Sequence, residues 1–81
     1  MSAYKDIKSK CTELKAVGFT NSSMVMSTNH ASVTLYGDHV FDINDPFDVA
    51  RIVAIIRATF NDYKHGIEEI KPNKIKVRLV L

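Results

Sequence analysis

The sequence predicts an α+β domain in which two helices pack on one face of a small sheet. Two segments have apolar residues at helical spacing, residues 3–17 and a second one that follows Asp45. The segments between and after them alternate polar and apolar residues, which is typical of strands exposed on one side. We therefore expect the order α-β-β-β-α-β, with a sheet that is antiparallel or mixed.

The first helix is expected over residues 3–17. Its apolar positions lie three or four residues apart, as on one face of a helix: Tyr4, Ile7, Cys11 and Leu14. Gly18 follows, and glycine often ends a helix because it adopts left-handed backbone angles without a Cβ clash.

Three strands forming an antiparallel meander are expected next, over residues 23–27, 32–36 and 39–43. Gly37 and Asp38 would form a two-residue hairpin turn, since glycine supplies the positive φ that such turns need. In the third of these strands, Phe41 and Ile43 should face the core.

The second helix has the clearest boundary signals. Asp45 can cap its N-terminus, Pro46 suits the first position, and Asp48 would lie near the positive end of the helix dipole. Gly66 is expected to end this helix. Residues 67–71 would then form a further helical turn or a loop.

The composition is that of one globular domain over residues 1–81, with 46% hydrophobic and 25% charged residues and no apparent internal repeat. The single cysteine, Cys11, cannot form an intramolecular disulfide, which favours a reducing compartment. The first ten residues are too polar for a signal peptide, and the longest apolar stretch, residues 49–60, contains two arginines. We expect a cytoplasmic protein that does not enter membranes.

No set of residues suited to catalysis or metal binding is evident. Cys11 lies in an apolar helix stripe, and His30, His39 and His65 are not spaced as metal ligands. The acidic residues belong to turns and helix ends, and the glycines are isolated rather than grouped in a phosphate-binding loop. We therefore expect no enzymatic activity, no metal and no cofactor.

The last strand, residues 74–81, alternates basic and apolar residues. With the apolar residues inward, Lys74, Lys76 and Arg78 would lie on the outer face of the sheet, near Tyr36. The expected neighbours on this face are Ser32, Thr34, Val25, Val40 and Asp42. Such charges can simply prevent edge pairing, or they can bind an acidic protein surface or a nucleic acid. We expect a protein partner, with nucleic acid as the alternative, and an exposed strand edge, such as that of the last strand, could pair in a homodimer.

The layout is similar to that of small inhibitor proteins of phages and other mobile elements, of the anti-CRISPR kind. Three segments follow the helix-meander-helix order of one such type: YKDIKSKCTEL, strands around YGDH, and INDPFDVARIVAIIRATFNDY. This resemblance covers the layout of residues 4–63 and transfers no site residues. It implies a protein that blocks the surface of a host protein, such as a defence protein, in the host cytoplasm. The same order also resembles a double-stranded RNA-binding domain, but the acidic DPFDVARIV stands where that family has its lysine cluster.

Overall fold

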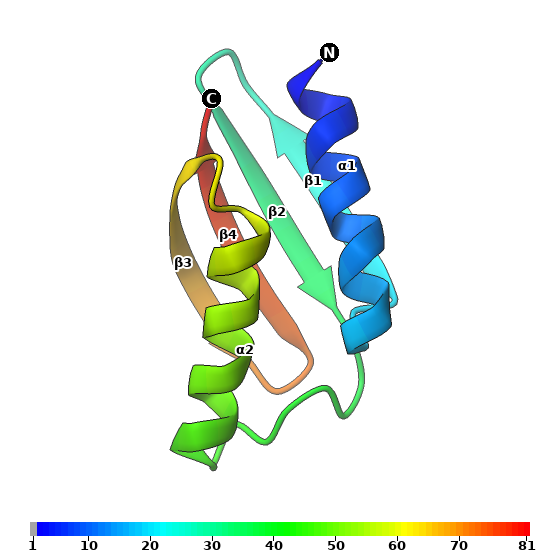
Figure 1. Ribbon diagram of the computed structural model, residues 1–81, viewed down its shortest axis with the longest axis vertical. Coiled ribbons are helices and arrows are strands. Elements are labelled where there is room, and N and C mark those ends of the chain that lie inside the picture. Colours follow the sequence, from blue (N-terminus) through cyan, green and yellow to red (C-terminus); the bar gives the residue numbers. More distant parts are fainter. Residues whose placement is uncertain (1) are drawn as a thin grey trace.

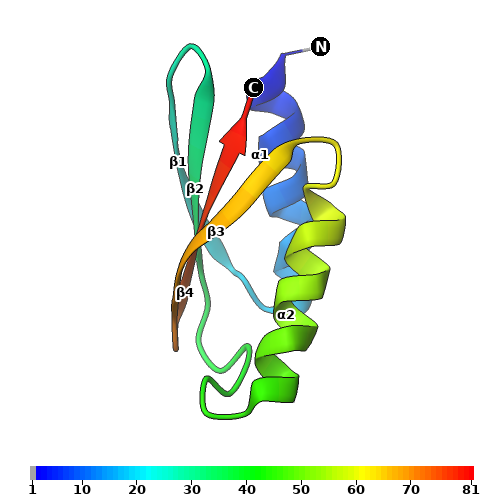
Figure 2. The same ribbon diagram turned by 90° about the vertical axis from the view of Figure 1, so that its left-hand side faces the viewer.

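A four-stranded antiparallel sheet forms the frame of the protein, and two helices lie on one of its faces (Figure 1; Figure 2). The structure is a computed structural model that describes residues 2–81. Along the chain the elements are α1 Ala3–Glu13, a 3-10 turn Leu14–Val17, β1 Asn21–Met26, β2 His30–Tyr36, α2 Pro46–Thr59, β3 Lys64–Lys71 and β4 Lys74–Val80. The strand order is β1-β2-β4-β3. The α+β class and the packing of both helices on one face are therefore confirmed.

Both helices begin and end near the predicted signals, except at the end of α2. Asp45 Oδ1 accepts hydrogen bonds from the backbone nitrogens of Phe47 and Asp48, at 3.0 and 3.4 Å, and Pro46 occupies the first turn. At the other helix, α1 and the 3-10 turn together cover the predicted residues 3–17. Gly18 follows with a φ of 123°, a backbone angle that residues with a Cβ rarely adopt.

The predicted third strand of the meander is wrong, because residues 39–43 belong to a loop between β2 and α2. The chain after β2 does not form a hairpin with a third strand. It lies next to the turn that precedes β4, where Gly37 N donates a hydrogen bond of 3.1 Å to Asn73 O. Both edges of β2 are then occupied, by β1 and β4. Phe41 still enters the core, with 7% of its surface exposed, whereas Ile43 stays 36% exposed.

The predicted end of α2 is also wrong. The helix ends at Thr59, and Gly66 lies inside β3 rather than after a helix. A β-bulge between Ile67 and Glu69 explains why residues 67–71 did not look like a strand. The bulge adds one residue, so Ile67 and Ile70 both pack on the core although they are three residues apart, which is helical spacing. The observed order is therefore α-β-β-α-β-β.

The core lies between the two helices and the inner face of the sheet. β2 and β4, the two central strands, alternate buried and exposed residues as predicted. The fully or almost fully buried side chains come from α1, α2, β2, β4 and the connecting segments: Ile7, Leu14, Phe19, Ala31, Val33, Leu35, Ile52, Ile56, Phe60, Ile75, Val77 and Leu79.

The fold consists of two similar halves, α1-β1-β2 and α2-β3-β4. The halves meet where β2 pairs antiparallel with β4, and Val33 faces Val77 near the middle of this ladder. The two helices run in opposite directions, and the outer strands lie at opposite edges (Figure 1). The halves are therefore related by an approximate two-fold axis near the Val33–Val77 pair. Only the order of elements and the pattern of burial repeat, which explains why no repeat is apparent in the residues.

Candidate binding surface

The face of the sheet opposite the helices is not covered by any element of the described residues 2–81 (Figure 2). We call it the open face. The β2–β4 register pairs Tyr36 with Lys74, Thr34 with Lys76, and Ser32 with Arg78. The four residues predicted to bind a partner, Tyr36, Lys74, Lys76 and Arg78, therefore lie together on this face. The predicted neighbours Ser32 and Thr34 lie among them.

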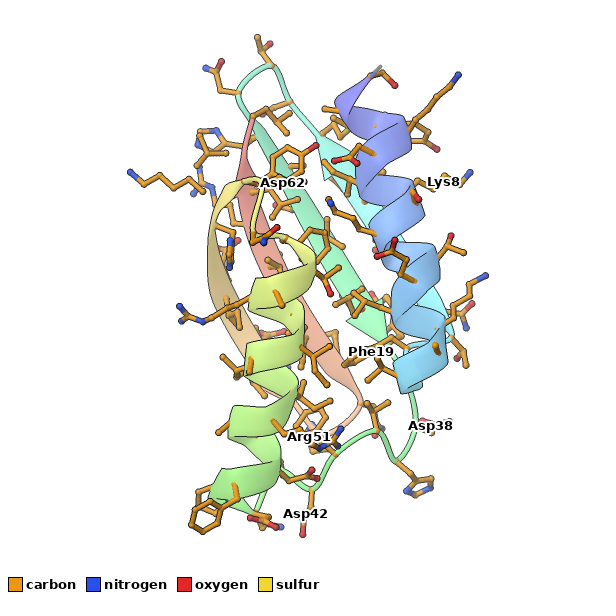
Figure 3. The ribbon with its side chains drawn as sticks, in the orientation of Figure 1. Lys8, Phe19, Asp38, Asp42, Arg51 and Asp62 are labelled. Atoms are coloured by element: carbon orange, nitrogen blue, oxygen red, sulfur yellow. The ribbon has the colours of Figure 1, made fainter. Side chains whose placement is uncertain are left out.

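Two other predicted neighbours are elsewhere, because the third strand does not exist. Val40 is buried in the loop and its side chain lies close to Gly18 and Gly37. Asp42 lies at the base of α2, close to Arg51 (Figure 3), and its backbone nitrogen donates a 2.6 Å hydrogen bond to Asp48. Val25 does lie on the open face, opposite Ser32, with 72% of its surface exposed.

Two glutamates of β3 join the open face, which was not predicted. Because of the bulge, Glu68 and Glu69 both lie beside Lys76, and Glu68 lines the same hollow as that lysine. Glu69 Oε1 lies 3.0 Å from Lys74 Nζ, and this hydrogen bond lowers the pKa of the Glu69 carboxyl. The charge of Lys74 is therefore partly neutralised by its neighbour Glu69.

Lys76 and Arg78 keep their positive charge available on the open face. Among residues 2–81, no carboxylate oxygen lies within 4.0 Å of either side chain's nitrogen atoms. Both side chains line a shallow hollow of about 270 Å³ that crosses the sheet. Its other lining residues are Val25, Ser27, His30, Ser32 and Glu68. The hollow combines two cations, hydroxyl groups, one carboxylate and one exposed apolar side chain.

The charge of the protein is distributed unevenly between its two sides. The open face has five basic side chains and two acidic ones, whereas the rest of the sequence has six basic and seven acidic ones. The basic residues of the open face are Lys64, Lys71, Lys74, Lys76 and Arg78. The net charge of +2 therefore comes from the open face, and the electrostatic potential is more positive there than on the helix side.

The cysteine and the histidines within residues 2–81 do not form a metal-binding group. Cys11 is 6% exposed, and burial raises the pKa of its thiol, while a hydrogen bond with Ser22 opposes this change. His65 Nδ1 lies 2.9 Å from Tyr63 O, and its Nε2 is buried without a hydrogen-bond partner among residues 2–81. In the same range, no three His, Cys, Asp or Glu side chains are grouped so that they could hold a metal ion.

Phe47 is an exposed aromatic residue that the sequence did not single out. It lies in the first turn of α2 with 88% of its surface exposed. Its backbone is held in place by the Asp45 cap, and Asp48 in turn binds Arg51 Nε at 2.8 Å. The only signal in the sequence is that Phe47 precedes the apolar stripe of the helix instead of belonging to it.

A search of protein-family models and of curated protein sequences finds no match to this chain. No helix within residues 2–81 has the length and the apolar character that crossing a membrane requires.

Proposed function

We propose that this protein is a non-enzymatic binding module that attaches to another protein through the open face of its sheet. The observation that carries the proposal is that Lys76 and Arg78, which have no carboxylate partner among residues 2–81, line a hollow on the face opposite the two helices. The more specific form of the proposal is an inhibitor from a phage or mobile element that occludes the surface of a host defence protein. This form rests on the sequence resemblance alone, because residues 39–43 form a loop where that layout has its third strand.

A carboxylate of the partner would enter the hollow beside Arg78. A guanidinium group can bind a carboxylate with two parallel hydrogen bonds, which fixes the orientation of the partner as well as attracting it. Val25 and Tyr36, which are 72% and 41% exposed, supply apolar contact area on either side of the cations. The sheet positions these side chains rigidly, because all of them belong to hydrogen-bonded strands.

Nucleic acid is the alternative partner, favoured by the net positive charge of the open face and by Tyr36, on which a base could stack. Glu68 and Glu69 argue for a protein instead. Glu68 lines the hollow together with Lys76 and Arg78, and Glu69 lies opposite Lys76 on the neighbouring strand. Both carboxylates would repel a phosphate backbone. A protein surface that has charges of both signs can match this pattern.

The test is recovery of a partner from host lysate with the purified protein, repeated after nuclease treatment and at raised salt. We expect one protein band that survives the nuclease. The variant Lys74→Glu/Lys76→Glu/Arg78→Glu should lose this band. The matched control, Lys5→Glu/Lys15→Glu/Arg57→Glu, makes the same change of charge at exposed residues of the helix side and should keep it. Equal recovery by both triple variants would exclude the open face.

A second experiment separates the nucleic-acid alternative. Glu69→Gln removes the carboxylate that neutralises Lys74, so it should strengthen binding to single-stranded DNA or RNA if the open face binds phosphates. Fluorescence anisotropy at several salt concentrations would measure this change. We expect weak binding that Glu69→Gln does not convert into a tight complex. Tight binding with a steep decrease in added salt would favour the alternative.

A further inference from the structure

The two edges of the sheet differ in how they are protected against pairing with another strand. β3, at one edge, has a bulge, four charged side chains (Lys64, Glu68, Glu69 and Lys71), and Pro72 directly after it. Bulges, charges and proline are the devices by which proteins keep sheet edges from pairing. This edge is therefore closed to a further strand.

β1, at the other edge, has none of these devices. Its six residues, NSSMVM, include no charge and no proline, and its ladder with β2 runs in continuous register from Asn21–Tyr36 to Met26–Ala31. Five of the six residues are exposed, including Val25 at 72% and Met26 at 36%. An uncharged, regular and partly apolar edge strand is a template for adding another strand.

We propose that β1 pairs antiparallel with β1 of a second copy, so that the two sheets form one eight-stranded sheet. A second copy fits this strand, because a two-fold axis pairs β1 with an identical strand. Each β1 side chain then lies opposite a residue of β1 from the other copy. At β1 all of those neighbours are neutral. The same arrangement at β3 would bring lysine against lysine or glutamate against glutamate in some registers, which is unfavourable.

The alternation of faces restricts the register. Ser23 and Val25 lie on the open face and Met24 lies on the inner face, so the faces match only when the axis passes at a residue, and the longest overlap of the two strands places it at Ser23 or at Met24. In either register Val25 becomes covered by the added strand. A groove between α1 and β1, lined by Tyr4, Lys8, Cys11, Ser22, Ser23 and Met24, lies directly beside this edge and can receive apolar side chains of the second copy.

Lys8 gives the dimer a recognisable salt dependence. It lies on α1 above the β1 edge, with its Nζ 5.7 Å from the centre of the Tyr4 ring. Around the two-fold axis the two α1 helices flank the joined strands, so their Lys8 side chains approach and repel each other. Added salt screens this repulsion. The dimer should therefore become tighter as salt increases, whereas binding of a phosphate backbone becomes weaker.

Sedimentation velocity from micromolar to millimolar concentration, at low and raised salt, measures the association. We expect a reversible monomer–dimer equilibrium that salt favours. Ser23→Lys makes the two lysines cross-strand neighbours, directly opposite each other when the axis passes at Ser23 and diagonal to each other when it passes at Met24, and it should raise the Kd at least about fivefold. Ser23→Glu should do the same, and an equimolar mixture of the two variants should recover the dimer. A protein that stays monomeric up to millimolar concentration overturns the proposal.

Two controls keep the result interpretable. Glu68→Lys makes a charge change on the protected β3 edge and should leave the equilibrium unchanged. Ser23 is exposed, so its variants should keep the circular dichroism spectrum and melting temperature of the parent protein. A dimer that Ser23→Lys leaves intact, or that Glu68→Lys disrupts, would also overturn the proposal. The sedimentation experiment uses the purified protein alone, so its outcome does not depend on whether the open face binds another protein.

Discussion

The hydroxyl group of Tyr63 donates a hydrogen bond of 2.7 Å to Asp6 Oδ2, and this bond joins α1 to the turn that precedes β3. Lys10 adds a second connection, since its Nζ lies 3.3 Å from Asp62 and 3.9 Å from Asp6. The two structural halves are thus linked by side chains at the helix side as well as by the β2–β4 ladder. The link is local to one end of the molecule, where α1 begins and α2 has just ended (Figure 3).

Replacing Tyr63 by phenylalanine should lower the free energy of unfolding by about 1 kcal/mol, the usual contribution of one hydrogen bond. The bond to Asp6 also raises the pKa of Tyr63 to about 12, because the carboxylate favours the protonated hydroxyl. The protonated hydroxyl therefore stabilises the fold fully below the unfolded pKa of about 10, and this contribution is lost as the pH rises from there to about 12.

Urea unfolding curves of the parent protein and Tyr63→Phe, measured at neutral pH and at increasing alkaline pH, test this prediction. The difference between the two proteins should shrink in the alkaline range. Tyr4→Phe is the control, because Tyr4 is 49% exposed and its hydroxyl makes no hydrogen bond to a carboxylate within residues 2–81. A constant difference at all pH values would mean that the Tyr63 hydroxyl is not bonded to Asp6 in solution.

Asp48 should make the stability depend on acid pH. Its carboxylate accepts a 2.6 Å hydrogen bond from Asp42 N and a 2.8 Å bond from Arg51 Nε, and these bonds lower the pKa of Asp48. The ionised group therefore stabilises the fold above the ordinary carboxyl pKa of about 4, and the contribution is lost as the pH falls below it. Melting temperatures of Asp48→Asn and the parent should converge in strong acid. Parallel melting profiles over the whole range would contradict this role.

Gly37 and Gly66 should respond differently to replacement by alanine. A Cβ at Gly37 would collide with the carbonyl oxygen of Gly18 and with the Val40 side chain, so Gly37→Ala should cost about 1–3 kcal/mol. No atom lies within 4 Å of a Cβ at Gly66, so Gly66→Ala should be neutral or stabilise by about 0.5 kcal/mol. Thermal unfolding of both variants provides the comparison. Equal losses would mean that the loop does not pack on Gly18.

Phe47 should contribute little to stability despite its size. Since it is 88% exposed, Phe47→Ala should change the free energy of unfolding by less than about 0.5 kcal/mol. Phe60→Ala removes a fully buried ring and should cost about 3–5 kcal/mol, which makes it the matched control. Denaturant unfolding measures both values. A large loss for Phe47→Ala would show that the ring is covered in solution.

Local signals in the sequence were sufficient for several parts of the fold. The cap and proline at Asp45 and Pro46 fix the start of α2, and strict alternation identifies β2 and β4 and their inner faces. For this reason the position of Tyr36, Lys76 and Arg78 on one exposed face could be predicted. These features depend only on residues that are close in the sequence.

The errors occurred where distant contacts override local preferences. The chain at Gly37 is hydrogen-bonded to Asn73 instead of forming a hairpin. This contact joins residues that are distant in the sequence, so local sequence patterns do not reveal it. The bulge at Glu68 gives β3 a helical spacing of isoleucines and also turns both glutamates onto the open face. The pairing of Glu69 with Lys74 could not be foreseen until β3 was known to be a strand.

The central position of β4 also governs how the chain can fold. β2 and β4 form the middle of the sheet, but α2 and β3 separate them along the chain. During synthesis, β2 can therefore pair with β4 only after β4 has left the ribosome. The apolar side chains of β2 stay partly uncovered until then. Closing this long-range ladder requires a large loss of chain entropy, which makes folding slower than in helical proteins of similar length. A nascent chain interrupted before β4 would expose an apolar sheet edge and would be a target for chaperones or for aggregation.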